Sequence, residues 1–305
     1  MALTDAQVAA FTRCAKTEFK KEYETVKDDS WKQIVMTVPS TKASETYNWF
    51  GATPKMREWV DERQPTGLAD YEYTLKNTKY EASIEVARTA IEDDETGQAI
   101  MRIRELADEA QRFFMDKTIE TLVGGAAALC YDGQYFFDNN HAEGDSGTQD
   151  NLTTSELTSA TLSTARATMW RYKDDRGKPM NLVGDTIVVP PELEATALEL
   201  VGSPLVDRYT SSSGTKEPTM NIHKGKYNVI VTPYITDVDS WYLLATNGTM
   251  RPLIYQERDP VRFEQRASGN DSDQAFLRDT FLYGVSSRFG LGYGDWRRAI
   301  ANVPN

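Results

Sequence analysis

The stretch DDETGQAIMRIRELADEAQRFFMDKTIETLVGG, residues 93–125, predicts a single long helix. Its apolar side chains recur every three or four residues, as on one face of a helix; they are Ile100, Ile103, Ala107, Ala110, Phe114 and Leu122. Asp93 and Asp94 suit the first turn, and Gly124 suits the end. At 1.5 Å per residue such a helix is a rod of roughly 40 Å, which is long for a globular domain.

The stretch before this helix predicts a hairpin. Residues 70–87, DYEYTLKNTKYEASIEVA, alternate between apolar and polar side chains, which is typical of half-buried strands. A turn near Lys76–Asn77 divides them into two strands, with Tyr71 and Tyr73 on the apolar face. A lone hairpin is marginally stable in water, so this face needs another surface to rest on.

Two earlier segments also need partner surfaces. A helix over residues 4–24 carries a thin apolar stripe that includes Val8, Phe11 and Phe19. One such stripe cannot stabilise a helix alone, so the helix must lie on another surface. Residues 30–67 mix tryptophans and prolines without a sustained period; they are too aromatic for a flexible linker and too irregular for a core element.

The rest of the chain mixes helices and short strands. Residues 154–173 predict an amphipathic helix, and GDTIVVPPELEATALELVGSP predicts a buried strand, a Pro-Pro turn and a short helix that ends at Gly202. Further strands are expected at 227–232, 241–246, 253–256 and in the final run 275–293, with a polar loop tip at 208–218. No βαβ rhythm is present, so the predicted fold class is α+β.

Composition bounds the function. The 305 residues are 40% hydrophobic and carry a formal net charge of −12. That charge repels phosphate backbones and argues against sequence-independent binding of nucleic acid. No apolar run approaches membrane-spanning length, and the N-terminus has no apolar core of a signal peptide. The two cysteines, Cys14 and Cys130, fit a reducing cytoplasm.

The best candidate for chemistry is LCYDGQYFFDNNHAEGD, residues 129–145. His141 and Glu143 copy the His-x-Glu of zinc deaminases, but the downstream Pro-Cys-x-x-Cys is absent. An oxygen-rich cation site is an open alternative, although EF-hand spacing is missing; its ligands would be Asp132, Asp138, Glu143 and Asp145. We favour a structural loop in which aromatic side chains anchor to the core and the acids stay in water. The anchors would be Tyr131, Tyr135, Phe136 and Phe137.

No other motif supports catalysis. The chain has no Walker A sequence and no Gly-x-Ser-x-Gly elbow. Cys130 stands beside Asp132, which should raise the pKa of its thiol and make a reactive thiolate unfavourable. GLGYG at 290–294 is interpreted as a tight turn after a strand. We therefore expect no catalytic residue, no cofactor and no metal.

Four stretches carry a family resemblance: STKASETYNWFGATPKMREWVDER (40–63), YDGQYFFDNNH (131–141), IYQERDPVRF (254–263) and FLYGVSSRFGLGYGDW (281–296). They resemble the major head subunits of Mu-like phages and prophages, and the order of elements is similar to the Hong Kong 97 fold of tailed-phage capsids. The resemblance extends from about residue 22 to residue 298. It implies a structural shell protein without catalysis.

The resemblance also implies partners and a location. The subunit would assemble with itself into hexamers and pentamers of an icosahedral head, with a separate scaffold protein and a portal. Packaged double-stranded DNA would be enclosed but not specifically bound, and no membrane would be involved. Assembly would take place in the cytoplasm of the bacterial host, and the product would be the virion.

In this fold we expect an N-terminal arm (1–44), an extended loop with the β-hairpin (45–87), a peripheral domain with the spine helix (88–130), a mainly axial domain (131–252) and a return to the peripheral domain (253–305). The arm and the extended loop would contact neighbouring subunits, because large aromatics and arginines anchor interfaces. The expected contact residues are Phe11, Phe19, Trp49, Arg57, Trp59, Glu62, Arg63, Tyr71 and Tyr73.

Two alternatives stay open at this point. One is another phage structural subunit, such as a decoration or tail-tube protein, against which the long helix and the separate hairpin argue. The other is a metal-dependent hydrolase that uses the acidic loop around His141.

Overall fold

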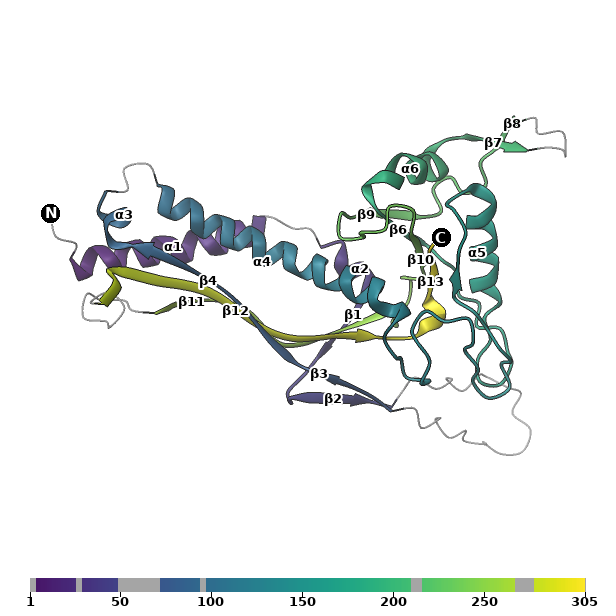
Figure 1. Cartoon of the computed structure of the whole chain (residues 1–305), viewed down its shortest axis with the longest axis horizontal. Coiled ribbons are helices and arrows are strands. Elements are labelled where there is room, and N and C mark those ends of the chain that lie inside the picture. Colours follow the sequence, from purple (N-terminus) through teal and green to yellow (C-terminus); the bar gives the residue numbers. More distant parts are fainter. Residues whose placement is uncertain are drawn as a thin grey trace, which may run out of the picture.

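The computed structural model describes residues 4–25, 29–48, 72–93, 97–209, 216–266 and 277–304. The molecule is elongated: a long helix and a long sheet form one half, and a compact unit around a second sheet forms the other (Figure 1). The N-terminus lies at the far end of the elongated half, and the C-terminus lies in the compact half. None of the described helices is both long and apolar enough to cross a membrane.

The elongated half is a four-stranded sheet with two helices on one face (Figure 1). The strand order is β1 (Val35–Pro39), β11 (Leu253–Arg266), β12 (Thr280–Tyr293), β4 (Thr78–Ala87). The helices are α1 (Asp5–Thr25) and α4 (Gln98–Val123), and the short α2 (Trp31–Ile34) precedes β1. Along β12 buried and half-buried residues alternate over most of its length, so one face meets the helices.

The long helix predicted over 93–125 is confirmed as α4, with a later start. A short helix, α3 (Arg88–Glu92), comes first, and Gly97 at φ 71° caps α4. This left-handed backbone suits glycine and separates the two helices. The predicted end is confirmed, since α4 passes into a 3₁₀ turn, η1 (Gly124–Ala126).

The compact half is built on a five-stranded sheet. Its order is β5 (Leu152–Thr153), β13 (Ala299–Asn302), β10 (Trp241–Leu244), β6 (Thr186–Val189), β9 (Asn228–Val231). The predicted helices are present as α5 (Ser159–Arg171) and α6 (Glu194–Gly202), the latter entered through η2 (Pro191–Leu193). Thr158 caps α5 with a reciprocal capping box. A separate hairpin, β7 (Leu205–Tyr209) and β8 (Lys216–Met220), projects from this half (Figure 1).

The last strand lies in a different sheet from the two strands before it. The strands β11 and β12 belong to the elongated half, and the return of residues 253–305 to a peripheral domain stays a prediction. After η3 (Trp296–Arg298), however, β13 pairs with β10 and β5 inside the compact half. All four β13 residues are buried, which is typical of an inner strand of a sheet whose two faces are both covered.

The hairpin predicted over 70–87 is wrong in its pairing. The strands exist, but β3 (Tyr73–Lys76) pairs with β2 (Ser44–Tyr47), whereas β4 pairs with β12. Asn77 lies between them without forming a hairpin turn. Its amide donates to Ser40 Oγ at 2.8 Å and to the carbonyl oxygen of Lys42 at 2.9 Å, which fixes the chain toward β2.

Candidate functional site: predicted contact surfaces and the 129–151 loop

The apolar stripe of α1 is buried within its own subunit. Val8 and Ala15 are fully buried, and Phe19 is 4% exposed, with its ring 5.0 Å from that of Phe263. Together with α4 and β12 these residues form one core cluster. Phe19 therefore packs within its own subunit, and its contact with a neighbouring subunit stays a prediction. The apolar stripe of α1 is covered by residues of α4 and of the long sheet in the same chain.

Phe11 is half-buried at the same helix face. Its ring lies edge-on to Tyr283, 5.8 Å between centroids, and the neighbouring Thr12 hydroxyl lies 3.2 Å from the Tyr283 hydroxyl. On the adjoining face Arg104 of α4 forms an ion pair with Glu18 at 2.6 Å. These contacts tie α1 along its length to its own subunit. Only the exposed part of Phe11 is open to a neighbour.

Tyr73 also faces its own chain. Its hydroxyl accepts the backbone N–H of Tyr293 in β12 at 3.1 Å, and burial raises the pKa of this tyrosine. Its cross-strand partner Tyr47 donates its hydroxyl to Gln256 in β11 at 2.7 Å. The Tyr73 side chain thus has a partner within its own chain, and its contact with a neighbouring subunit stays a prediction. The other expected contact residues lie outside the described residues; they are Trp49, Arg57, Trp59, Glu62, Arg63 and Tyr71.

The 129–151 loop is anchored by aromatic side chains, as predicted, with one exception. Phe136 and Phe137 are fully buried, and Phe136 stacks on Tyr293 with 4.7 Å between ring centroids. Tyr131 is buried as well, but Tyr135 is 45% exposed. Tyr135 forms an isolated bridge with Leu129 at the outer end of a tight turn, so its side chain points away from the core.

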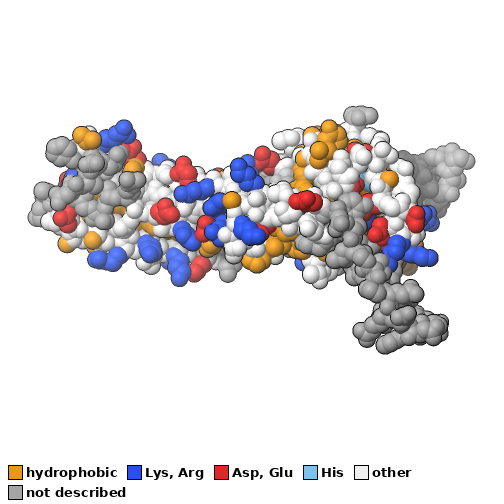
Figure 2. All heavy atoms as spheres, turned by 90° about the horizontal axis from the view of Figure 1, so that it is seen from below, with side chains coloured by type: hydrophobic (Ala, Val, Ile, Leu, Met, Phe, Trp, Pro, Cys, Tyr) orange, Lys and Arg blue, Asp and Glu red, His pale blue; other side chains and the backbone are white. Residues whose placement is uncertain are grey.

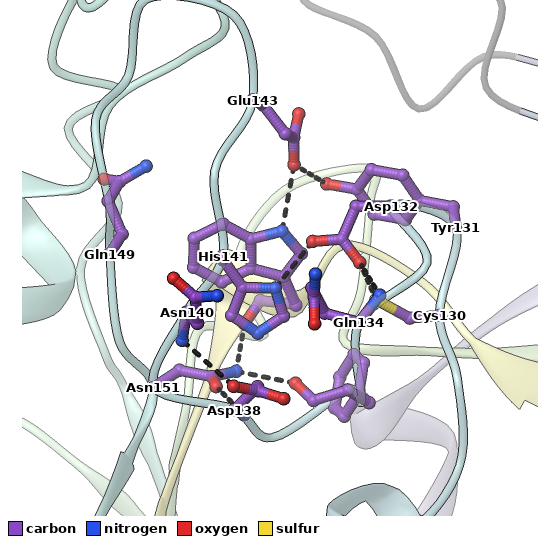
Figure 3. A network of polar contacts seen from close by, with 12 residues as sticks. Cys130, Tyr131, Asp132, Gln134, Asp138, Asn140, His141, Glu143, Gln149 and Asn151 are labelled. Atoms are coloured by element: carbon purple, nitrogen blue, oxygen red, sulfur yellow. Dashed lines mark hydrogen bonds and ion pairs between the residues drawn. The ribbon is translucent and has the colours of Figure 1, made fainter.

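The expectation that the acids stay in water is wrong for two of them. The Asp132 side chain is 2% exposed and accepts hydrogen bonds from His141 Nδ1 at 2.6 Å and from the Cys130 thiol at 2.9 Å (Figure 3). Burial alone would raise the pKa of Asp132, but these hydrogen bonds outweigh it and hold the pKa below its usual range. The thiol beside it behaves as predicted, because burial and then Asp132 raise the pKa of Cys130.

Glu143 connects the loop to the segment that follows β12. Its Oε1 accepts from the Tyr131 hydroxyl at 2.7 Å and from Trp296 Nε1 at 2.9 Å. The guanidinium of Arg297 lies 3.4 Å from Glu143 Oε2 and 2.8 Å from Asp295, and all three side chains are almost completely buried. Burial raises the pKa of Glu143 against the opposing effect of Arg297. The carboxylate belongs to a buried ion cluster and does not face solvent.

A second connection runs through Asn151. Its side-chain amide donates to the carbonyl oxygens of Phe136, Trp296 and Ala299 at 2.8–3.2 Å, and its Oδ1 accepts the backbone N–H of Asp138 at 2.9 Å. Figure 3 shows Asn151 below the imidazole of His141, on the side away from Glu143. The loop and the segment 295–299 are therefore held together from both ends of the cluster.

One trio within the described chain has ligand atoms close enough to invite a metal ion: Cys130, Asp132 and His141, all within 4.8 Å of one another. Two ligands of one tetrahedral zinc ion lie roughly 3.3–3.8 Å apart, since each bond is about 2.0–2.3 Å. The 2.6 Å and 2.9 Å separations to Asp132 are shorter and are those of hydrogen bonds. The oxygen-rich cation site considered as an alternative is not formed by its proposed carboxylates. Asp132 and Glu143 are hydrogen-bonded to different partners, and Asp145 is exposed.

The elongated half with its long helix and the compact half with a second sheet define a class, the capsid subunits of tailed phages with the expected Hong Kong 97 fold. The chain is similar to a subunit of the procapsid of bacteriophage JBD30, with a TM-score of 0.58 and 26% identity over 97% of this chain and 76% of that chain. A subunit of the virus-like particle from Pyrococcus furiosus shares the fold alone, with a TM-score of 0.53 and 8% identity over 95% of this chain and 98% of that chain.

The family follows from the sequence match. The model of the Mu-like prophage major head subunit gpT matches residues 8–156, 150–235 and 236–304, and the chain belongs to this family. The Mu-like prophage FluMu major head subunit of Haemophilus influenzae is 28% identical over 270 residues, 88% of this chain and 64% of that protein. The major capsid protein of Escherichia phage Mu is 24% identical over 304 residues, 99% of this chain and 75% of that protein.

Proposed function

We propose that this chain is the main structural subunit of a Mu-like phage head, and that copies of it form hexamers and pentamers of an icosahedral shell around double-stranded DNA. The observation that carries the proposal is the family match across residues 8–156, 150–235 and 236–304, which includes both halves of the molecule. The similarity to a procapsid subunit supports self-association as the mode of action. A separate scaffold protein and a portal would be its partners in the bacterial cytoplasm.

The proposed contacts between subunits lie mainly in the segment 49–71, with Trp49, Arg57, Trp59, Glu62, Arg63 and Tyr71. Two tryptophans and two arginines in one segment are the residue types that contribute most at interfaces. The pair Tyr47 and Tyr73 marks where this segment begins and ends on the folded subunit.

A structural role is favoured over a hydrolase. In the hydrolase alternative His141 and Glu143 would act on a substrate, which requires access to it. His141 is 0% exposed and Glu143 2% exposed, and both are engaged with buried partners. The mixed charge of the surface also supports enclosure of DNA without specific binding. On the face seen in Figure 2, basic and acidic side chains are interspersed along the elongated half.

Substitution of one loop tryptophan tests the contact proposal. Trp59→Asp should lower the yield of assembled particles at least about tenfold, since a lost anchor of roughly 2 kcal/mol repeats at every equivalent contact. Trp59→Phe is the matched control and should retain assembly. Thermal melting of the unassembled variant should match that of the wild type. A Trp59→Asp subunit that unfolds in isolation would place this tryptophan in its own core instead.

A further inference from the structure

The strand β3 crosses directly over β12 at two glycines. A Cβ at Gly292 would lie 2.8 Å from the Tyr73 hydroxyl oxygen and 2.9 Å from Leu75 Cδ1. A Cβ at Gly290 would lie 2.9 Å from the carbonyl oxygen of Lys76. Contacts below 3.0 Å require one side to move. At Gly290 the contact is with the backbone of β3, so a methyl group there would have to shift the strand, whereas at Gly292 the contacts are with the ends of the Tyr73 and Leu75 side chains. The prediction that GLGYG (290–294) forms a tight turn is therefore wrong, because residues 290–293 belong to β12. Gly290 and Gly292 form the surface of β12 on which β3 lies, and we call this pair of glycines the seat.

Two hydroxyl groups fasten the ribbon of β2 and β3 onto this seat. Tyr47 and Tyr73 are cross-strand partners. The Tyr73 hydroxyl holds the backbone of Tyr293 in β12, and the Tyr47 hydroxyl holds Gln256 in β11. Gln256 is fully buried and its amide lies 3.4 Å from the carbonyl oxygen of Leu75. The ribbon is thus fixed to two different strands of the long sheet.

The other end of the ribbon is also locked. Glu45 accepts hydrogen bonds from the Ser40 hydroxyl at 3.0 Å and from the backbone N–H groups of Thr41 and Lys42 at 3.1 and 3.2 Å. These bonds lower the pKa of Glu45, the backbone bond from Thr41 most of all. Asn77 closes the same corner through Ser40, to which its amide donates. The ribbon therefore has little freedom to pivot about its base.

We propose that Gly290 and Gly292 form a positioning seat that fixes where the ribbon of β2 and β3 lies on the long sheet, and that this position is required for assembly. The inference rests on the proposed shell function. The strand β12 is paired on both sides, with β11 and β4, and cannot retreat. The strand β3 pairs only with β2 among the described strands. A methyl group at residue 290 should therefore displace the ribbon and leave the sheet in place, and a methyl group at residue 292 should displace the Tyr73 hydroxyl from the backbone N–H of Tyr293.

The test combines Gly292→Ala with hydrogen exchange and electron microscopy. Amides of 44–47 and 73–76 should exchange about tenfold faster, the effect of one lost hydrogen bond, while those of β11 and α4 stay unchanged. Particle yield should fall at least about tenfold by the same reasoning as for the loop contacts. Gly202→Ala is the control, because a Cβ there meets nothing within 4 Å and both readouts should match the wild type.

The possible outcomes distinguish the positioning role of Gly290 and Gly292 from the proposed shell function. Wild-type exchange in the ribbon of Gly292→Ala, or normal particles from it, would overturn the seat. If Gly292→Ala loosens α4 and β11 as well, Tyr73→Phe decides, since it removes one hydroxyl without a clash. Tyr73→Phe should speed exchange in 73–76 alone, and unchanged exchange would again overturn the proposal. Failure of the wild type to form particles would contradict the shell function, while the exchange result would still judge the seat.

Discussion

The imidazole of His141 lies flat on the indole of Trp296, with 3.9 Å between ring centroids and 6° between planes. This stack joins the 129–151 loop to the segment between β12 and β13, where the elongated half passes into the compact half. Asp132 holds one edge of the imidazole and Glu143 accepts from the indole. His141, the candidate catalytic residue in the sequence, thus links the 129–151 loop to the segment around Trp296 through a buried ring stack.

Removing the stack of His141 on Trp296 should destabilise the subunit. His141→Ala is expected to lower the free energy of unfolding by about 3 kcal/mol, because it empties a buried site and leaves the Asp132 carboxylate without its strongest donor. Urea unfolding followed by tryptophan fluorescence measures the change. Asn140→Ala, at the exposed neighbouring position, should change stability by less than about 0.5 kcal/mol.

The same variant tests the hydrogen-bonded interpretation of the Cys130, Asp132 and His141 trio. We expect the metal content of the purified protein, measured by plasma mass spectrometry, to be the same in the wild type and in His141→Ala. One zinc per chain in the wild type that disappears in the variant would show that the trio is a metal site.

The lowered pKa of Asp132 makes its contribution depend on pH. A carboxylate whose pKa is lower in the folded chain stabilises it above the unfolded pKa, near 4, and this contribution is lost as the pH falls through the folded value. The difference in unfolding free energy between the wild type and Asp132→Asn should therefore be constant from pH 8 to about pH 5 and shrink below about pH 4. Asp239→Asn, in an exposed loop, provides the control. A difference that does not vary with pH would mean that the charge of Asp132 contributes nothing.

The two thiols should differ in reactivity. Cys14 is exposed, whereas Cys130 is buried and the pKa of its thiol is raised. Titration of the native, unassembled protein with a chromogenic disulfide at pH 8 should therefore modify one thiol per chain, and denaturant should release the second. Rapid modification of both in the native protein would contradict the closed environment of Cys130.

Phe19 should behave as a core residue. Phe19→Ala is expected to cost about 3–5 kcal/mol of unfolding free energy, the usual range for a buried phenylalanine. Its exposed neighbour Lys20 gives the control, Lys20→Ala, with an effect near zero. Normal stability of Phe19→Ala combined with loss of particles would return α1 to the role of an arm on a neighbouring subunit.

Periodicity predicted the helices α4, α5 and α6, because their apolar spacing and end signals are local. It could not give strand partners. The alternation of residues 70–87 is equally compatible with two strands that pair with each other and with two strands that pair elsewhere. In the structure β3 pairs with β2 and β4 pairs with β12. Likewise, the stripe of α1 required a surface, but the sequence does not say whose surface it is.

The candidate site shows the same division. The buried Phe136 and Phe137 follow from their hydrophobicity, which acts wherever they lie. The burial of Glu143 could not be foreseen from its neighbours, because its partners Trp296 and Arg297 lie at the far end of the chain. The signal was present in GDWRR, residues 294–298, where an acid and two arginines flank a tryptophan within an apolar run.

Electron microscopy of the purified full-length chain tests the central claim most directly. The account predicts closed particles whose symmetric reconstruction contains rings of five and six copies, with the long helix α4 recognisable in each subunit. Open tubes, or dispersed subunits under every condition in which the chain is folded, would contradict it.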